Sequence, residues 1–285
     1  MAIAPLFVPG DRPDRIQKAA SRGARHVVID LEDAVAAGEK PRARKSAVEA
    51  LSNRWPGTRY MIRVNALDSE SILVEDLRAL EPVLRYVDGL ILPKIACADG
   101  VREIENLLAG LSDVAPALVP TIETPEGVYH ARDIARSSKS VATLLFGPVD
   151  LSAQLGIDLC AETPGLVHAR SAVVLACSSA GLVSPLDGPW TNLDDVGGLE
   201  QSSAHARSLG FGGKIAIHPD QVGTIEKFFV PTDAQTNWAK DVLAQFDHAV
   251  VAGSGVARLP DGTFIDQPVA ARARHILQLA GRTRA

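Results

Sequence analysis

The sequence contains only three cysteines among its 285 residues, Cys97, Cys160 and Cys177. Their number is odd and no two of them form a CxxC pair, which argues against a disulfide framework and a structural zinc site. The chain also lacks an uninterrupted apolar run of about 18 residues, the length that a transmembrane helix needs. No basic stretch followed by an apolar core begins the sequence, as a signal peptide would require. We therefore expect a cytoplasmic protein in a reducing compartment.

Positive charge and aromatic residues are also scarce. Lys and Arg number 29 against 34 Asp and Glu, a formal net charge of −5, and Phe, Trp and Tyr make up 5% of the chain. This mild acidity argues against nucleic acid or an anionic membrane as the main partner. With 46% hydrophobic and 22% charged residues, the composition is that of an ordinary folded domain.

The sequence does contain a repeated pattern of short apolar, β-branched runs, each followed by a polar segment and a helical pattern. Eight runs are predicted as strands: Leu6–Pro9, His26–Asp30, Tyr60–Val64, Gly89–Pro93, Ala117–Thr121, Thr143–Gly147, Leu182–Leu186 and Lys214–His218. Successive runs begin 20 to 39 residues apart, which leaves room for one crossover helix between neighbours. Eight parallel strands with helical crossovers predict an α/β fold of the TIM (β/α)8 barrel type.

The sequence also contains patterns that predict helices. Helices are expected over Asp14–Arg22, Asp76–Tyr86, Val101–Leu111, Glu126–Ala135, Val167–Ala180, Leu199–Leu209, Asp220–Phe229 and Thr232–Ala252. Gly253-Ser-Gly255 and Pro260-Asp-Gly262 then bracket a hairpin turn or flexible joint, and Gln267–Gly281 resumes as a basic amphipathic helix. We predict a catalytic barrel over residues 1–252 and a C-terminal extension over 253–285. From spacing alone, this extension is either a packing arm or a lid over an active site.

Polar residues gather at the predicted strand ends, where barrel enzymes carry their chemistry. They are Asp30, Glu32, Asp33, Arg63, Asn65, Lys94, Glu123, Asp150, Asp187 and His218. Charged groups that face one mouth are costly to desolvate unless they pair or hold an ion. The collection therefore predicts a bound cation.

Glu123 and Asp150 follow adjacent strands, and no His or Cys lies near them at metal spacing. Two carboxylates form a hard oxygen site that favours Mg²⁺ or Mn²⁺. The alternative is that each carboxylate caps the helix that follows it. Arg63 also has two interpretations. Its planar guanidinium group can bind a substrate carboxylate through two hydrogen bonds, but it can equally form a structural ion pair with the acidic residues at the end of the second strand. Arg15 and Lys18 indicate either an anion site or a solvated helix face.

A series of motifs resembles the citrate lyase β-subunit-like proteins, which include malyl-CoA and citramalyl-CoA lyases, in the HpcH/HpaI aldolase superfamily. The motifs run in order across almost the whole chain: Leu6–Arg15, Val28–Val35 with Glu39-Lys40, Arg63–Asn65, Leu92–Lys94, Ile122–Thr124, Phe146-Gly147 with Asp150-Leu151, Ala216–Pro219 and Ile265-Asp266. Any one of them is weak, but eight in sequence are highly specific.

The resemblance implies a barrel that cleaves or forms a carbon–carbon bond beside a CoA thioester with the help of Mg²⁺. It implies that Glu123 and Asp150 bind the metal and that Arg63 binds the oxygens of the oxo acid. It further implies that Asp266 acts as an acid/base at the site of a neighbouring subunit in a homotrimer or hexamer. Arg15 and Lys18 are implied to contact the phosphates of CoA.

The chain departs from the family pattern at Val149, where many relatives are acidic, and at Asn192, where they often carry Asp. These departures, together with Trp190 nearby, leave the substrate more open than the metal.

We therefore expect a Mg²⁺-dependent lyase of short 3-hydroxyacyl-CoA thioesters such as malyl-CoA or citramalyl-CoA. Its products would be acetyl-CoA and a 2-oxo acid, namely glyoxylate, pyruvate or oxaloacetate. Three alternatives stay open. They are the β subunit of a citrate lyase complex served by an acyl carrier protein, a thioesterase or malate synthase-type activity at the same metal site, and an aldolase of 2-oxo acids without CoA.

Overall fold

The computed structural model describes residues 3–284. Its contacts divide the chain into two compact units, one within residues 2–226 and one within residues 227–285. Among the described residues, no helix combines the length and the apolar character that crossing a bilayer requires.

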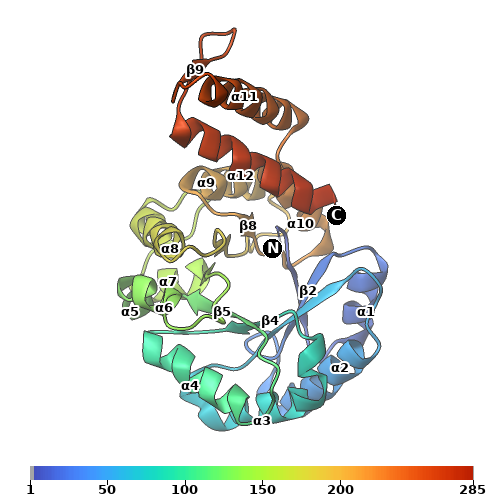
Figure 1. Cartoon of the computed structure of the whole chain (residues 1–285). Coiled ribbons are helices and arrows are strands. Elements are labelled where there is room, and N and C mark those ends of the chain that lie inside the picture. Colours follow the sequence, from blue (N-terminus) through green and yellow to red (C-terminus); the bar gives the residue numbers. More distant parts are fainter. Residues whose placement is uncertain (1–2, 285) are drawn as a thin grey trace. The chain divides into compact units, whose positions relative to one another are not determined.

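Eight parallel strands in sequence order form the centre of the first unit. They are β1 (Leu6–Pro9), β2 (His26–Asp30), β3 (Arg59–Arg63), β4 (Gly89–Leu92), β5 (Ala117–Ile122), β6 (Leu145–Phe146), β7 (Leu186–Asp187) and β8 (Gly213–Lys214). A parallel bridge between Leu6 and Ala216 joins β1 to the segment after β8, and the Phe7 N–H donates to the Ala216 carbonyl at 2.8 Å. The strands therefore close on themselves, which confirms the predicted TIM-type barrel (Figure 1).

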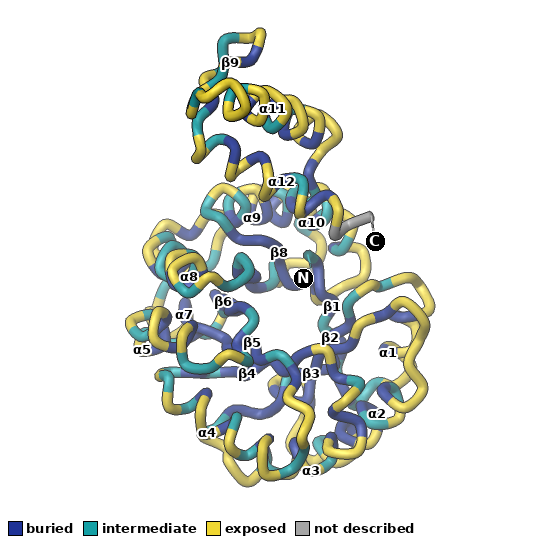
Figure 2. The backbone as a smooth tube through the Cα atoms, viewed as in Figure 1, coloured by how far each residue is buried: buried dark blue, intermediate teal, exposed yellow. Residues whose placement is uncertain are grey.

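Apolar side chains from β1 to β7, and one from the residue after β8, fill the barrel. The buried cluster consists of Val28, Met61, Ile91, Val119, Leu145, Leu186 and Ile215, with the partly buried Phe7 packed against it. Alternate strand residues point to opposite faces, so neighbours such as Val27 and Ile29, both fully buried, face away from this cluster. Figure 2 shows the resulting arrangement, in which buried strands are surrounded by helices with exposed outer faces.

Helices and short 3₁₀ turns connect the strands around the outside of the barrel, and a last helix follows β8. They are α1 (Pro13–Ser21), η1 (Ala37–Glu39), α2 (Lys40–Ser52), η2 (Leu67–Ser69), α3 (Glu70–Leu80), η3 (Glu81–Tyr86), α4 (Ala98–Ala109), α5 (Pro125–Tyr129), α6 (Ala131–Ala135), α7 (Pro148–Leu155), η4 (Pro164–Leu166), α8 (Val167–Ser179), α9 (Val196–Leu209) and α10 (Pro219–Phe229). α1 buries Ile16, Ala19 and Ala20, which share one face at helical spacing. α9 begins at the cap Asp195 and ends at Gly210, whose φ of 103° suits a residue without a side chain.

Most predicted elements differ from the observed ones by one or more residues at their ends, and two of these differences have a clear physical reason. The seventh strand covers Leu186–Asp187 instead of Leu182–Leu186, since Pro185 has no N–H to donate to a neighbouring strand. The helix expected over Asp76–Tyr86 is the end of α3 followed by the separate turn η3. Pro82 lies at the start of that turn, where its ring and missing N–H interrupt the α-helical hydrogen bonds.

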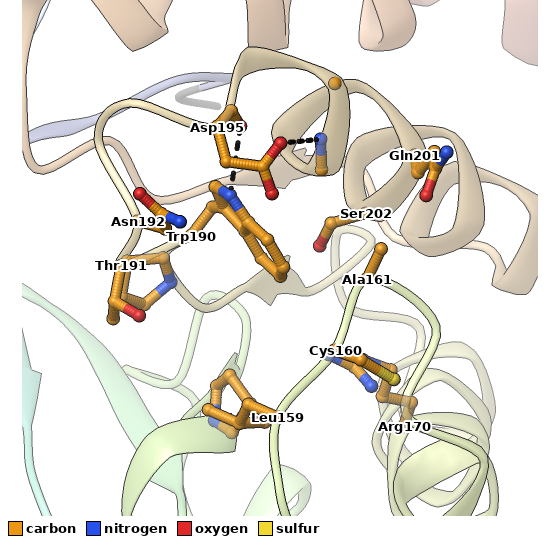
Figure 3. A pocket seen from close by; sticks show the side chains of 14 residues that line it. Leu159, Cys160, Ala161, Arg170, Trp190, Thr191, Asn192, Asp195, Gln201 and Ser202 are labelled. Carbon is orange, nitrogen blue, oxygen red and sulfur yellow. Dashed lines mark hydrogen bonds between the residues drawn. The ribbon is translucent and has the colours of Figure 1, made fainter.

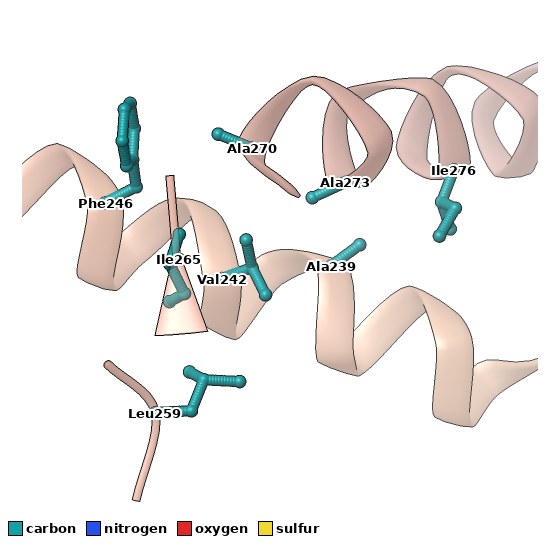
Figure 4. Close-up of a cluster of buried hydrophobic side chains, with 8 residues drawn as sticks. All are labelled: Ala239, Val242, Phe246, Leu259, Ile265, Ala270, Ala273 and Ile276. Carbon is teal, nitrogen blue, oxygen red and sulfur yellow. The ribbon is translucent and has the colours of Figure 1, made fainter. Parts of the chain in front are cut away.

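The second unit has its own apolar core. It contains α11 (Asp233–Val251), an antiparallel hairpin of β9 (Ala257–Arg258) and β10 (Phe264–Ile265), and α12 (Gln267–Arg284). Their buried side chains form one cluster: Ala239, Val242, Phe246, Leu259, Ile265, Ala270, Ala273 and Ile276 (Figure 4). The expected hairpin and the helix after it are thus present, and α11 packs with them. The assignment of residues 253–285 as a lid domain stays a prediction.

Candidate active site

Four charged residues lie where neighbouring strands of the barrel end. Asp30 is the last residue of β2, Arg63 is the last of β3, Lys94 follows β4, and Glu123 follows β5 directly. Because the strands are parallel and adjacent, these side chains meet at the carboxyl end of the barrel.

Glu123 is a buried carboxyl group, 4% exposed. Its Oε1 accepts a hydrogen bond of 2.7 Å from the backbone N–H of Lys94. Burial, followed by the negative charge of Asp150, raises the pKa of Glu123 to about 7. A cation between the two carboxylates would relieve both effects, so this pair fits a divalent metal ion such as Mg²⁺.

Neither carboxylate is the cap of the helix that follows it. Thr124 caps α5, and its hydroxyl accepts the Gly127 N–H at 3.0 Å. Gly147 is the N-cap of α7, and the half-buried Asp150 lies in the first turn of that helix. The capping alternative is therefore wrong for Glu123 and Asp150 as N-caps.

Gly147 makes room for the buried carboxylate. The pairing of Ile122 with Phe146 places Gly147 opposite Glu123 on neighbouring strands. A Cβ atom on Gly147 would overlap the Cβ and Oε2 atoms of Glu123. A side chain at this position would thus displace Glu123, which gives the Phe146-Gly147 motif a physical role.

In the described part of the chain, no cluster of three or more His, Cys, Asp or Glu side chains could hold a metal ion. A cation at Glu123 and Asp150 would consequently have two protein carboxylates as ligands. Water and substrate oxygens would complete its coordination, which is common for Mg²⁺.

Lys94 connects Glu123 to a second group of charges. Its φ of 55° is unusual for a residue with a side chain, and such conformations persist where the surroundings hold them. The backbone N–H of Lys94 holds Glu123, while its Nζ donates to Glu32 Oε1 at 2.6 Å. Burial opposes the charged form, but the hydrogen bond to Glu32 raises the pKa of Lys94 above its usual value. The position of Lys94 after the fourth strand is evident from the sequence, but its two contacts are not, because Glu32 and Glu123 are distant in the chain.

Arg63 forms the ion pair that sequence analysis kept as an alternative. Its Nε and Nη2 donate to the two oxygens of Asp30 at 2.8 and 2.5 Å, and Nη1 lies 2.9 Å from Glu32 Oε2. Burial favours the neutral form, but the hydrogen bond to Asp30 and the nearby carboxylates outweigh it and raise the pKa of Arg63 above its usual value. Because a guanidinium group carries five N–H donors, Nη1 and Nη2 each retain a second N–H for a ligand.

A second layer of polar residues supports the loop after β2. Lys40 Nζ donates to the carbonyls of Leu31 and Glu32 at 2.6 and 2.7 Å and to Asn65 Oδ1 at 2.7 Å. Asn65 in turn donates to Asp76 at 2.6 Å. These bonds fix the backbone that carries Glu32, and they give Lys40 and Asn65 a structural role.

The other predicted site residues belong to other elements of the chain. Asp266 belongs to the second unit, where its Oδ1 accepts the Val269 N–H at 3.1 Å in the first turn of α12. Arg15 and Lys18 are exposed on α1, one turn apart. The proposed roles of these three residues stay predictions.

Fold and site together define a barrel enzyme with paired carboxylates at its mouth. The sequence matches the HpcH/HpaI aldolase/citrate lyase family over residues 4–219, and the chain belongs to that family. It is 30% identical to the L-malyl-CoA/beta-methylmalyl-CoA lyase of Rhodobacter capsulatus over 284 residues, which cover 92% of this chain and 89% of that protein. It is 32% identical to the citrate lyase subunit beta of Escherichia coli K12, with 96% and 92% covered.

A solved structure shows the same likeness. The CitE protein of Mycobacterium tuberculosis, in complex with magnesium, acetoacetate and coenzyme A, has a TM-score of 0.78 and 30% identity, and the match covers 98% of each chain. The predicted family and lyase class are thus confirmed, and the magnesium of this relative agrees with the predicted Mg²⁺ cofactor. The homotrimer or hexamer and the cytoplasmic location stay predictions.

Proposed function

We propose that this chain is a Mg²⁺-dependent lyase that cleaves a short 3-hydroxyacyl-CoA, such as malyl-CoA or citramalyl-CoA, to acetyl-CoA and a 2-oxo acid. The observation that carries the proposal is the buried Glu123 beside Asp150, two carboxylates whose mutual repulsion a cation would relieve. Malyl-CoA lyase relatives that match over 92% of the chain support the substrate class.

Each residue of the cluster has a task in this reaction. Glu123 and Asp150 would hold the Mg²⁺ ion, which would supply Lewis acidity for the substrate hydroxyl and for the emerging 2-oxo acid. The Lys94 N–H donates to Oε1 of Glu123 and thereby fixes the position of this carboxylate. The outer N–H groups of Arg63 orient the substrate carboxylate, while Asp30 fixes the plane of the guanidinium.

As the carbon–carbon bond breaks, the substrate hydroxyl loses its proton to become the oxo group, and the acetyl thioester leaves as an enolate that must gain a proton. One carboxylate can accept the first proton and donate it to the enolate carbon. We assign this role to Asp266 acting at the site of a neighbouring subunit. Its Oδ1 is engaged by the Val269 N–H, and Oδ2 is the oxygen assigned to carry the proton.

A panel of acyl-CoA thioesters with the purified protein, with and without Mg²⁺, tests the proposal. Acetyl-CoA, the 2-oxo acid and free CoA are followed separately, so that cleavage is distinguished from hydrolysis. We expect acetyl-CoA and glyoxylate or pyruvate in equal amounts, and no turnover by Glu123→Gln. The matched control is Glu126→Gln, which changes an exposed carboxylate three residues away and should leave activity unchanged. Release of free CoA without acetyl-CoA would show that the protein is a thioesterase and not a lyase.

A second candidate function is the β subunit of a citrate lyase complex. The match to the citrate lyase subunit beta of Escherichia coli covers as much of the chain as the match to the malyl-CoA lyase, which favours it. Activity with an acyl carrier protein thioester but not with the free CoA thioester would establish this alternative.

A further inference from the structure

A pocket of about 540 Å³ in the barrel unit lies between the loop after β7, the start of α9 and the loop before η4 (Figure 3). Thr191, Asn192, Gln201 and Ser202 contribute polar groups to its wall, and Arg170 of α8 contributes the charged one that is buried. Neither Glu123 nor Asp150 lines this pocket. The pocket therefore does not include the two candidate metal ligands.

Arg170 belongs to a buried group with two cations and one carboxylate. Its Nε donates to Asp187 Oδ1 at 3.3 Å, and Lys214 Nζ donates to Asp187 Oδ2 at 2.6 Å. Arg170, Asp187 and Lys214 are 3%, 0% and 1% exposed. Two basic side chains thus share one carboxylate, and burial lowers the pKa of Lys214 against the effect of Asp187, because a positive charge is costly in this environment.

One nitrogen of the Arg170 guanidinium also lacks an acceptor from the described residues. Within residues 3–284, its Nη1 atom is buried and has no hydrogen-bond partner. Buried donors of this kind are nearly always satisfied in native proteins, by protein, water or ligand atoms. The missing partner of Nη1 and the two basic side chains on one carboxylate both indicate an anionic acceptor.

The loop that forms the opposite wall is fixed in a shape that leaves the pocket open. Trp190 Nε1 donates to the Asp195 carbonyl at 3.1 Å, and Asp195 Oδ1 accepts the Gly198 N–H at 2.8 Å. Asp195, a carboxylate in the pocket wall, is therefore engaged as the cap of α9. Gly197 lies in the first turn of that helix and has no side chain to cover its N–H, a group that favours anions.

We propose that this pocket binds a small oxyanion, either a carboxylate or a phosphate monoester, against Arg170. The anion supplies the acceptor for Nη1 and a second negative charge beside the Arg170, Asp187 and Lys214 group. Gly197 and the hydroxyl of Ser202 supply further donors from the facing wall. The proposal does not depend on the lyase activity, because the pocket shares no ligand residue with the metal site.

Calorimetric titration of the full-length, metal-free protein tests the proposal. One arm uses inorganic phosphate and the other uses malonate, which separates a phosphate from a carboxylate ligand. We expect one of them to bind with millimolar or better affinity at one site per chain. Asn192→Asp should weaken that binding by about tenfold or more, because it places a negative charge in the pocket wall. The substituted side chain has the same size and still accepts the Asp194 N–H, so the loop should be retained.

The matched control is Asn53→Asp, which adds the same charge at an exposed position at the end of α2. It should leave anion binding unchanged. Arg170→Gln should abolish binding, and should this variant fail to fold, Asn192→Asp still decides the question. The proposal is overturned if neither anion binds, or if Asn192→Asp and Asn53→Asp bind the anion as tightly as the unchanged protein.

Discussion

Replacement of Glu123 by Gln is expected to stabilise the metal-free protein at alkaline pH while it abolishes Mg²⁺ binding. Burial and the charge of Asp150 raise the pKa of this carboxyl group from 4.5 to about 7. That difference corresponds to about 3 kcal/mol of unfavourable free energy in the folded state once Glu123 is ionised. Gln is uncharged, and its amide oxygen can still accept the Lys94 N–H.

The sign follows from proton binding in the two states. The unfolded chain releases this proton near pH 4.5, whereas the folded protein retains it up to about pH 7. Between these values the folded state binds more protons, so the free energy of unfolding of the unchanged protein falls as the pH rises. Below both pKa values the carboxyl is protonated in both states and the penalty is absent. Above both, the penalty is complete.

Urea unfolding of both proteins without metal, at about pH 5 and about pH 8, measures this effect. We expect the variant to be more stable by up to about 3 kcal/mol at the higher pH and by less than about 1 kcal/mol at the lower pH. Added Mg²⁺ should stabilise only the unchanged protein, because a ligand of the folded state shifts the unfolding equilibrium. Glu126→Gln, at an exposed carboxylate, should behave like the unchanged protein. Equal stability at the higher pH, or an equal response to Mg²⁺, would refute the assignment of Glu123.

Three further substitutions test the other parts of the site. Arg63→Lys should lose turnover but keep its Mg²⁺ affinity, because an ammonium group cannot bond both oxygens of Asp30 and a substrate carboxylate together; a kcat/KM near that of the unchanged protein would leave Arg63 with a structural role alone. Gly147→Ala should weaken Mg²⁺ binding in a folded protein, since the added methyl group collides with Glu123; an unchanged affinity in calorimetry would contradict this. Asp266→Asn should retain metal and thioester binding and lower kcat by about 10²–10⁴-fold, the usual contribution of a general acid. Mixed oligomers of this variant with Arg63→Ala should regain activity, and if stable mixed oligomers stay inactive, Asp266 does not act on a neighbouring subunit.

The sequence by itself determined the fold class and the identity of the paired carboxylates. Short apolar runs indicate strands, and apolar residues that recur at helical spacing indicate helices. Both patterns are properties of the local sequence. The observed bounds of β1 and β2 coincide with the predicted ones. Position in the segments that follow adjacent strands then selects Glu123 and Asp150, because parallel strands bring their carboxyl ends to one mouth.

Only the tertiary structure decided how the charged groups are partnered. Asp30 and Arg63 are 33 residues apart, and Lys94 and Glu32 are 62 residues apart, so no local pattern specifies these bonds. The left-handed backbone conformation of Lys94 is also not evident from the sequence. A glycine at this position would have indicated such a conformation, but a lysine does not. Thr124 and Glu123 are neighbours in sequence, and which of them caps α5 depends on the direction that each side chain takes after β5. The raised pKa of Glu123 arises from burial by residues distant in the chain and from the charge of Asp150, so no local pattern specifies it.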